Sequence, residues 1–365
     1  MLSLSALTLW APPLAILLTL LVLTVLNPVA ARFGLLDHPQ GRKDHARPTP
    51  VTGGLAMAIG SMVVAGSLQE GRPLLAFLLA AAMLVAVGLL DDIYDLRWWW
   101  RILAQVLAAL VMVEVGGVRI EQLGQLVGMT GTGLGVLSVP FTVFAAVGII
   151  NAVNMIDGAD GLAGSLVLAA LVMLAAAALY SGNGALADRT LILAGAVTGF
   201  LVWNIRHPWR TRAKVFMGNA GSAFLGLVIA WVSFRLTQNP GHPVSPVLAL
   251  WLLPIPIVDC LVLIARRTRE GRSPFAAGRD HIHHFMIDAG ITPGWVTFWL
   301  TGFSLLCGVV IGQAMRADVP NILLLLAFSA VCIWWYWLTA RRERALGFFR
   351  HLRSPRHAVR DDIVR

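Results

Sequence analysis

The stretch of this sequence best equipped for chemistry is NAVNMIDGADGL at residues 151–162, between two strongly apolar runs. Two asparagines and two aspartates follow one another there at intervals of three residues, which would align them along one face of a continuing helix. They are Asn151, Asn154, Asp157 and Asp160. Polar residues at membrane depth are costly, so they are candidates for function. A loop that only caps two helices is the alternative interpretation.

A second acidic group lies in the run LLDDIYDLRWWW. Asp91 and Asp95 are four residues apart and share a helical face, with Asp92 beside them. Three carboxylates at one helix end repel one another unless a cation or a proton offsets their charge. A divalent metal ion, or one carboxyl group with a raised pKa that acts as a base, would explain the group. The alternative is a solvated acidic helix end that pairs with Arg97 or Arg101.

Three basic or glycine-rich segments could receive phosphates. The segment KVFMGNAGS contains a Gly-x-x-Gly turn whose backbone N–H groups could seat a phosphate, with Ser222 at the start of the next helix. The segment DHPQGRKDHARPTP offers Lys, Arg and His side chains, although an ordinary basic loop is the simpler interpretation. The segment RRTREGRSPFAAGRDHIHHF sets three histidines among five arginines. Histidine can ligate metals, transfer protons or bind phosphate. Asp259 could pair with Arg266 or face the site.

The elements that position these residues follow from the composition. Of the 365 residues, 58% are hydrophobic and 13% are charged, whereas soluble domains are about 45–50% apolar and about 25% charged. We therefore predict an all-α, polytopic integral membrane protein. The three cysteines lie in apolar runs without metal-ligand spacing, and we interpret them as small buried hydrophobic residues.

We predict about eleven transmembrane helices. Their approximate cores are residues 7–29, 53–68, 74–90, 98–115, 137–150, 162–180, 191–205, 223–236, 246–264, 296–315 and 321–338. A spanning helix needs about 20 apolar residues, so the short fifth and seventh runs leave a ten-span arrangement open.

The distribution of basic residues predicts the orientation. With eleven spans, nearly all of the 28 Lys and Arg residues fall on one side. The exceptions are Arg72, Arg119, Arg189, Arg235 and Arg316. Basic residues favour the cytoplasmic side, which places the N-terminus in the periplasm and the C-terminus in the cytoplasm. We expect residues 1–340 to form the membrane domain and residues 341–365 a basic cytoplasmic tail.

The motifs DDIYD, NAVNMIDGADGLAG, KVFMGNAGS and HIHH, in that order, resemble those of the polyprenyl-phosphate N-acetylhexosamine-1-phosphate transferases. The segment RTREGRSPFAAGRDHIHHF looks most similar to the bacterial branch that uses undecaprenyl phosphate. The resemblance covers the chain from residue 37 to about residue 294.

The resemblance implies a reaction and a setting. N-acetylglucosamine 1-phosphate would pass from UDP-N-acetylglucosamine to undecaprenyl phosphate, with release of UMP and with Mg²⁺ or Mn²⁺ as cofactor. The enzyme would be a multi-pass protein of the bacterial inner membrane whose active site faces the cytoplasm. It would start O-antigen or enterobacterial common antigen synthesis, as a homodimer and with no nucleic acid partner.

The resemblance also assigns roles to residues. Catalytic roles fall on Asp91, Asp92, Asp157 and Asp160, with Asp91 as the base or electrostatic group at the acceptor phosphate. Metal ligands would be Asp91, Asn154 and Asn219. Phe216 matches an aromatic residue that stacks on uracil. Substrate-binding roles fall on Lys43, His45, Arg47, Asn154, Phe216, Arg266, Arg267, His281, His283 and His284.

One position departs from the family pattern. The family has Met-Gly-Asp where this chain has Met-Gly-Asn, so Asn219 offers a neutral oxygen in place of a carboxylate ligand. The departure leaves the level of activity open. The alternatives are a related transferase for another UDP-N-acetylhexosamine, a membrane phosphatase, and a transporter of polyprenyl-linked sugars, whose polar residues should lie at the bilayer midplane.

Overall fold

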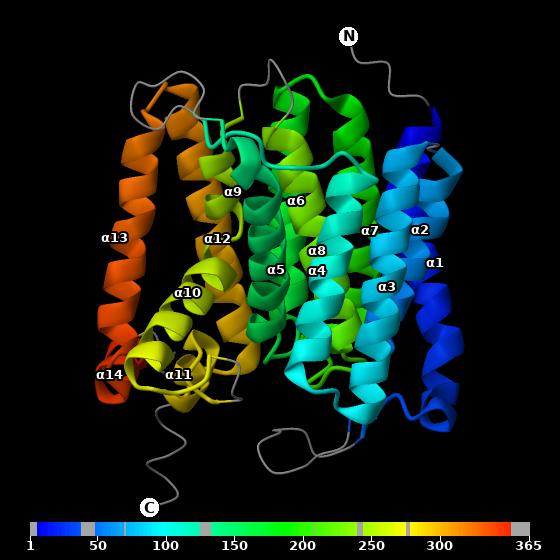
Figure 1. Cartoon of the computed structure of the whole chain (residues 1–365). Helices are drawn as coiled ribbons and strands as arrows, with labels where there is room; N and C mark the ends of the chain where they lie inside the picture. The colour runs from blue at the N-terminus through cyan, green and yellow to red at the C-terminus, as the bar shows by residue number, and fades with distance from the viewer. Residues whose placement is uncertain are drawn as a thin grey trace, which may run out of the picture.

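The structure, a computed structural model, describes residues 6–37, 48–68, 71–124, 133–207, 209–238, 244–274 and 278–351. Long helices stand side by side in one bundle (Figure 1). In the described part of the chain the only sheet is a two-stranded one, in which β1 (Leu36–Asp37) pairs antiparallel with β2 (Thr49–Pro50). The predicted all-α class is confirmed.

The longer helices carry the apolar runs. They are α1 (Ala6–Leu26), α2 (Gly53–Leu68), α3 (Arg72–Tyr94), α4 (Trp98–Glu114), α5 (Ser138–Ile156), α6 (Leu162–Tyr180), α7 (Gly184–Asn204), α8 (Gly218–Thr237), α12 (Pro293–Arg316) and α13 (Asn321–Thr339). Shorter elements are α9 (Pro246–Leu252), α10 (Pro254–Arg269), α11 (Ile282–Asp288), α14 (Arg342–Arg350) and the 3-10 turns at Asn27–Phe33 and Gly135–Leu137.

All eleven predicted runs fall on helices, but they do not all qualify as spans. Among the described residues, eight helices are long and apolar enough to cross a membrane, or nine if the bent pair α9–α10 counts as one span. Helices α2 and α4, with 16 and 17 residues, fall below that length. The count of eleven is therefore not confirmed. Helix α1 begins at the end of the bundle opposite to where α13 finishes, as an odd number of crossings produces (Figure 1).

Helix α8 is the centre of the bundle, and its first turn is fixed by close backbone contacts. A Cβ atom at Gly88 would lie 2.4 Å from the Cα atom of Ala220, and one at Gly54 would lie 2.2 Å from the backbone nitrogen of Gly221. Small residues allow helices to approach this closely. The start of α8 is therefore held against α2 and α3, where the DDIYD motif is.

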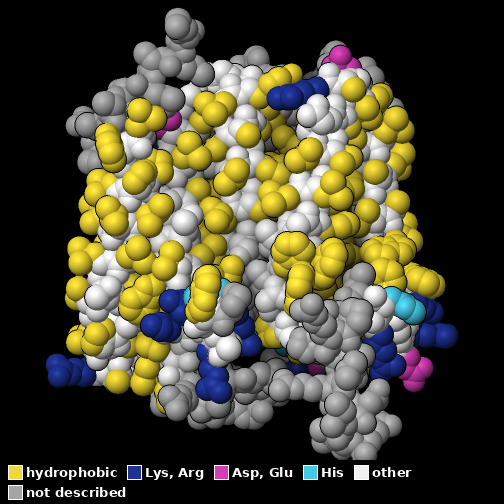
Figure 2. All heavy atoms as spheres, turned by 180° about the vertical axis from the view of Figure 1, so that it is seen from behind, with side chains coloured by type: hydrophobic (Ala, Val, Ile, Leu, Met, Phe, Trp, Pro, Cys, Tyr) yellow, Lys and Arg dark blue, Asp and Glu magenta, His cyan; other side chains and the backbone are white. Residues whose placement is uncertain are grey.

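The remaining helices complete the same end of the molecule. Helices α9 and α10 meet at an angle of 89°, with Pro254 and Pro256 in the first turn of α10. A proline lacks the backbone N–H that would continue the preceding helix. Helix α10 runs toward α11 and α14 at the end of the bundle where Figure 2 shows most of the Lys and Arg side chains. Ala345 and Phe349 of α14 are buried against the bundle.

Candidate active site

A cavity of about 840 Å³ opens at the end of the bundle that carries most of the basic side chains. It lies where α3 and α5 end and where α8 begins. The charged and amide side chains that line it are Asp37, Asp91, Asp92, Asp95, Asn154, Asp157, Asp160, Asn204, Arg206, Asn219, Arg279 and His284. Residues from four of the motifs, far apart in the sequence, therefore share one cavity.

Asp92 joins the end of α3 to the start of α8. Its Oδ1 atom accepts a hydrogen bond from the backbone nitrogen of Asn219 at 2.8 Å, and its Oδ2 atom accepts one from that of Ala220 at 3.4 Å. A negative charge at a helix N-terminus is stabilised by the unpaired N–H groups and the helix dipole. Gly218, with φ at 70°, has no room for a Cβ atom, which would lie 2.4 Å from Asp92 Oδ2.

Asp91 lines the cavity but already has partners. Its side chain is 1% exposed. Its Oδ1 atom accepts a hydrogen bond from the backbone nitrogen of Leu96 at 2.9 Å, and its Oδ2 atom accepts one from Arg101 at 3.2 Å. The pairing with Arg101 considered from the sequence is thus present. The role of Asp91 as a base stays a prediction, and it requires Arg101 to release the carboxylate.

The alignment of four polar residues on one helical face is wrong beyond Ile156, because α5 ends there. Asp157 follows the helix end and faces the cavity. Burial, and then the charges of Asp92 and Asp160, raise its pKa to about 7. Asp160 lies in the turn before α6, where its Oδ2 atom accepts hydrogen bonds from Arg206 at 2.6 Å and from the backbone of Ala213 at 3.0 Å.

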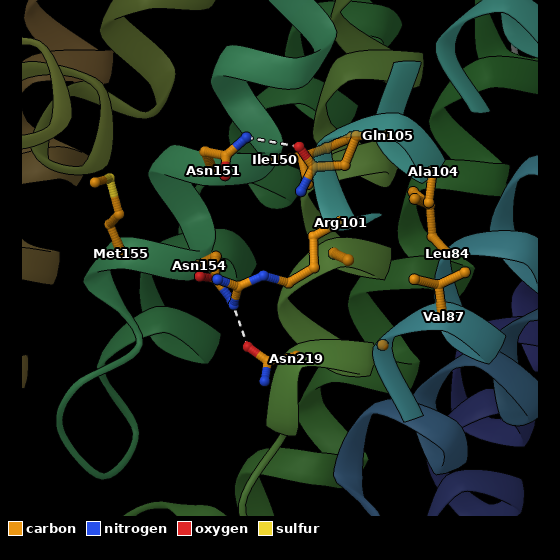
Figure 3. A pocket seen from close by; sticks show the side chains of 12 residues that line it. Leu84, Val87, Arg101, Ala104, Gln105, Ile150, Asn151, Asn154, Met155 and Asn219 are labelled. Carbon is orange, nitrogen blue, oxygen red and sulfur yellow. Dashed lines mark hydrogen bonds between the residues drawn. The ribbon is translucent and has the colours of Figure 1, made fainter. Parts of the chain in front are cut away.

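Two asparagines connect this cavity to a smaller one of about 90 Å³ between α3, α4, α5 and α8 (Figure 3). The Nδ2 atom of Asn154 donates to Asn219 Oδ1 at 3.0 Å and to Ser222 Oγ at 2.8 Å. Asn151 lines only the smaller cavity, where its Nδ2 atom donates to Gln105 Oε1 at 2.6 Å. Asn219 therefore holds α5 to α8 through a hydrogen bond, whether or not it also meets a metal ion.

Of the three histidines, His281 and His283 are buried in the protein and His284 lines the cavity. His281 Nδ1 pairs with Asp259 Oδ2 at 2.8 Å, so Asp259 neither pairs with Arg266 nor faces the site. His283 is 1% exposed, and neither ring nitrogen has a hydrogen-bond partner in the described part of the chain. Burial, and then the charges of His284 and His281, keep its pKa well below the usual value. Of the three, only His284 lines the cavity. The substrate-binding roles of His281 and His283 stay predictions.

Arg266 and Arg267 of α10, which were predicted to bind the substrate, are also buried in the protein. Arg267 is 2% exposed, and it donates through Nη2 and Nε to the carboxylate of Asp280 at 2.6 and 3.2 Å. Arg266 donates to the carbonyl oxygens of Thr339 at 2.8 Å and Asp280 at 2.7 Å. Burial alone would raise the pKa of Asp280, but the hydrogen bonds and charges of these arginines outweigh it and lower the pKa to about 2.

Two other arginines and one aromatic residue line the cavity. Arg206 and Arg279 line the cavity. Arg206 was missed, because no local spacing links it to Asp160. Phe216 lines the cavity as predicted, and its position is fixed by hydrogen bonds from its nitrogen to Pro50 O at 2.8 Å and from Gly53 N to its carbonyl oxygen at 3.0 Å. The predicted loop residues Lys43, His45 and Arg47 lie outside the described residues.

The donors suit a magnesium ion that the substrate helps to bind. No group of three His, Cys, Asp or Glu side chains in the described ranges is arranged to hold a metal ion. Asp92 and Asp157 nevertheless face one cavity, and the charge of Asp92 helps to raise the pKa of Asp157, as expected for carboxylates that lack a countercharge. Mg²⁺ is commonly bound by one or two carboxylates together with substrate phosphates and water.

Comparisons with known proteins show which family has this helical bundle with an acidic cavity at one end. The profile of glycosyl transferase family 4 matches residues 74–237. Three similar proteins carry the name undecaprenyl-phosphate alpha-N-acetylglucosaminyl 1-phosphate transferase.

The protein of Escherichia coli (strain K12) is 34% identical over 333 residues, which cover 89% of this chain and 90% of that protein. The protein of Yersinia pestis is 33% identical, with coverage of 89% and 91%. The protein of Haemophilus influenzae is 35% identical over 293 residues, with coverage of 80% and 82%. This chain belongs to the polyprenyl-phosphate N-acetylhexosamine-1-phosphate transferases and is a phosphotransferase, as its motifs predicted.

Proposed function

We propose that this chain transfers N-acetylglucosamine 1-phosphate from UDP-N-acetylglucosamine to undecaprenyl phosphate and releases UMP. The observation that carries the proposal is the single cavity of about 840 Å³ in which the DDIYD, IDGADG and MGN motifs meet. The similar protein of Escherichia coli (strain K12) is named for this activity, and its alignment covers about nine tenths of this chain. The reaction forms a bond from an acceptor phosphate oxygen to the sugar-bound phosphorus, while the bond from that phosphorus to the bridging oxygen breaks.

The residues of the wall can be given parts in that reaction. Phe216 offers a ring for the uracil base, and aromatic stacking suits any flat base. Arg279 and His284, which line the same cavity as the aspartates, offer donors for the pyrophosphate. Asp160 holds Arg206 at the cavity edge through the 2.6 Å hydrogen bond. Asp91 would orient the acceptor phosphate once Arg101 turns to that phosphate.

Asp92, Asp157 and the oxygens of Asn154 and Asn219 would hold a Mg²⁺ or Mn²⁺ ion. When bound, such an ion supplies positive charge that stabilises the oxygens of the transferred phosphate. The protein's own part is to keep these donors in place: the start of α8 positions Asp92, and the end of α5 positions Asp157.

The orientation is part of the proposal. The basic end of the bundle would face the cytoplasm, where nucleotide sugars are made, and the protein would reside in the bacterial inner membrane with residues 341–365 as its cytoplasmic tail. It would act as a homodimer in the first membrane step of an O-antigen or common-antigen type pathway. A transporter would place its binding residues near the bilayer midplane, whereas these motif residues lie at helix ends.

Turnover can be tested directly. Purified protein is incubated with radiolabelled UDP-N-acetylglucosamine, undecaprenyl phosphate and Mg²⁺, and butanol-extractable label is counted. We expect label that depends on the lipid, and less label from UDP-N-acetylgalactosamine. Folded protein that yields no lipid-linked label from any UDP-N-acetylhexosamine would contradict the proposal, and equal yields would contradict the choice of sugar.

Topology can be tested with single cysteines in a cysteine-free variant. Gly158 is unsuitable, because a Cβ atom there would lie 2.2 Å from His283 Nε2. The side chains of Arg272 and Arg119 are 52% and 51% exposed. A membrane-impermeant thiol reagent added to intact cells should label Arg119→Cys and spare Arg272→Cys. The reverse pattern would invert the orientation.

A further inference from the structure

A second large cavity, of about 480 Å³, lies between α6, α9 and α12. The ends of α6 and α12 that line it are at the end of the bundle opposite to the active site. Its walls are mostly apolar. They include Met173 and Ala177 of α6, Leu248 and Leu252 of α9, and Gly308 and Val309 of α12. None of these residues belongs to the motifs of the active site, so the transferase reaction gives this cavity no role.

Part of the cavity wall is exposed on helices that would meet the membrane lipids. Val309 and Tyr180, both on its wall, are 56% and 55% exposed. They belong to α12 and α6, which are two of the helices long and apolar enough to span a membrane. Apolar side chains exposed on such helices face acyl chains in the bilayer. A lipid chain can therefore reach the cavity from the bilayer along the exposed faces of these helices.

The rim of the cavity carries one charge of each sign. The guanidinium carbon of Arg316 lies 4.7 Å from the centre of the Tyr180 ring, and Asp318 lies beside it on the same wall. In the described part of the chain, neither Arg316 nor Asp318 has an ion pair or a side-chain hydrogen bond. Arg316 is also one of the few basic residues on this side of the membrane. Charges that the protein leaves unpaired at a membrane surface are available to a lipid headgroup.

We propose that this cavity binds a zwitterionic glycerophospholipid with an amine headgroup, such as phosphatidylethanolamine. The phosphate would meet the Arg316 guanidinium, which suits phosphate oxygens. The ammonium group would meet Asp318, and an acyl chain would fill the space along α12. A polyprenyl phosphate lacks the amine, and a free phosphate lacks the chain, so each uses only part of this site.

Filling the cavity tests whether a lipid occupies it. Gly312 lines the cavity and has open space around it, with no atom within 4 Å of the place that a Cβ atom would take. Gly302, on the same helix but outside the cavity, is equally open and provides the matched control. Full-length protein is transferred into nanodiscs of equal phosphatidylethanolamine, phosphatidylglycerol and phosphatidylcholine, released into detergent, and weighed by native mass spectrometry. We expect bound phosphatidylethanolamine on the parent and on Gly302→Phe, and its loss on Gly312→Phe.

Changing the rim tests the headgroup. Arg316→Gln should weaken retention of phosphatidylethanolamine by about tenfold or more, as loss of a charged hydrogen-bond partner does. Asp318→Asn suits the left-handed backbone at this position, where φ is 54°, and should abolish the preference for phosphatidylethanolamine over phosphatidylglycerol. Inorganic phosphate at millimolar concentration should not displace the lipid. Equal retention by the parent and Gly312→Phe, or no headgroup preference in the parent, would overturn the proposal.

Discussion

The acidic cluster and the arginine–histidine cluster relate to the catalytic cavity in opposite ways. The acidic cluster comprises Asp91, Asp92 and Asp157, and the arginine–histidine cluster comprises Arg266, Arg267, His281 and His283. All three aspartates line the cavity. The basic residues instead bind Asp259, Asp280 and backbone carbonyl groups, or lie fully buried. The acidic cluster thus lines the cavity, whereas the basic cluster is buried or paired within the protein.

This difference predicts that substitutions in the two clusters fail in different ways. Asp91→Asn keeps the shape of the side chain and removes its charge, so the protein should fold while turnover falls by about 10²-fold or more. The measurement is the rate of lipid-linked product at saturating substrates. Asp95→Asn is the control: Asp95 is exposed, and its left-handed backbone, with φ at 51°, accepts asparagine. If Asp91→Asn kept near-normal turnover, the catalytic role predicted for Asp91 would be wrong.

Arg267→Gln should show the opposite behaviour. It removes the closest partner of Asp280, which keeps Arg266 at 3.3 Å. The loss of stability should therefore stay below the cost of breaking a fully buried pair, about 3–5 kcal/mol. The thermal midpoint should fall clearly, while molecules that remain folded keep most of their turnover. Arg119→Gln is the control, because Arg119 pairs with Glu121 on the exposed surface, where ion pairs contribute little. A stable Arg267→Gln protein without activity would place Arg267 in the site after all.

Asn219→Asp tests how complete the acidic cluster is. The new carboxylate would lie next to Asp92, whose Oδ1 atom accepts the hydrogen bond from the backbone of residue 219. Two close carboxylates attract a divalent ion more strongly than one does. We expect turnover to reach half-maximum at about tenfold lower Mg²⁺ concentration, in line with the effects of single groups around bound metals. Overlapping Mg²⁺ titrations of the two proteins would mean that position 219 serves only the hydrogen bond with Asn154.

The smallest expected effect is on the stability of the protein at acidic pH. The arginines lower the pKa of Asp280 to about 2 from the usual 3.8. A carboxyl group whose pKa is lower in the folded state stabilises the protein above pH 3.8, and this contribution is lost as the pH falls toward 2. The thermal midpoint of the parent should therefore fall between pH 5 and pH 3 by more than that of Asp280→Asn. Equal slopes would mean that the ion pair does not stabilise the basic cluster.

The sequence predicted the contents of the cavity better than its geometry. Apolar runs located the helices, and the motifs located Asp92, Asn154, Asp157 and Phe216 on one wall. The pattern could not reveal that α5 ends at Ile156, because the intervals of three residues continue past that point. Helix lengths were also underestimated: the predicted runs 137–150 and 191–205 lie in helices of 19 and 21 residues.

The sequence did not reveal the partners of the basic cluster, for a different reason. Arginines near a phosphate-binding motif indicate a binding role only when they do not pair with a carboxylate of the protein. Arg267 pairs with Asp280, which lies thirteen residues later in the sequence and beyond the end of α10. His281 pairs with Asp259, which lies earlier in the sequence, on α10. Such pairings depend on how α10 and α11 pack, which spacing does not encode. For the same reason no pattern linked Arg206 to Asp160.

The tight seating of α8 has a consequence for how the enzyme could respond to its substrates. Backbone atoms of α8 touch α2 and α3 at Gly221 and Ala220 with no side chain between them, so this wall cannot shift without separating helices. Any narrowing of the cavity around a substrate must then come from other parts of its lining, such as Arg279 and His284. Induced fit would be one-sided, because Asp92 and the start of α8 stay in place.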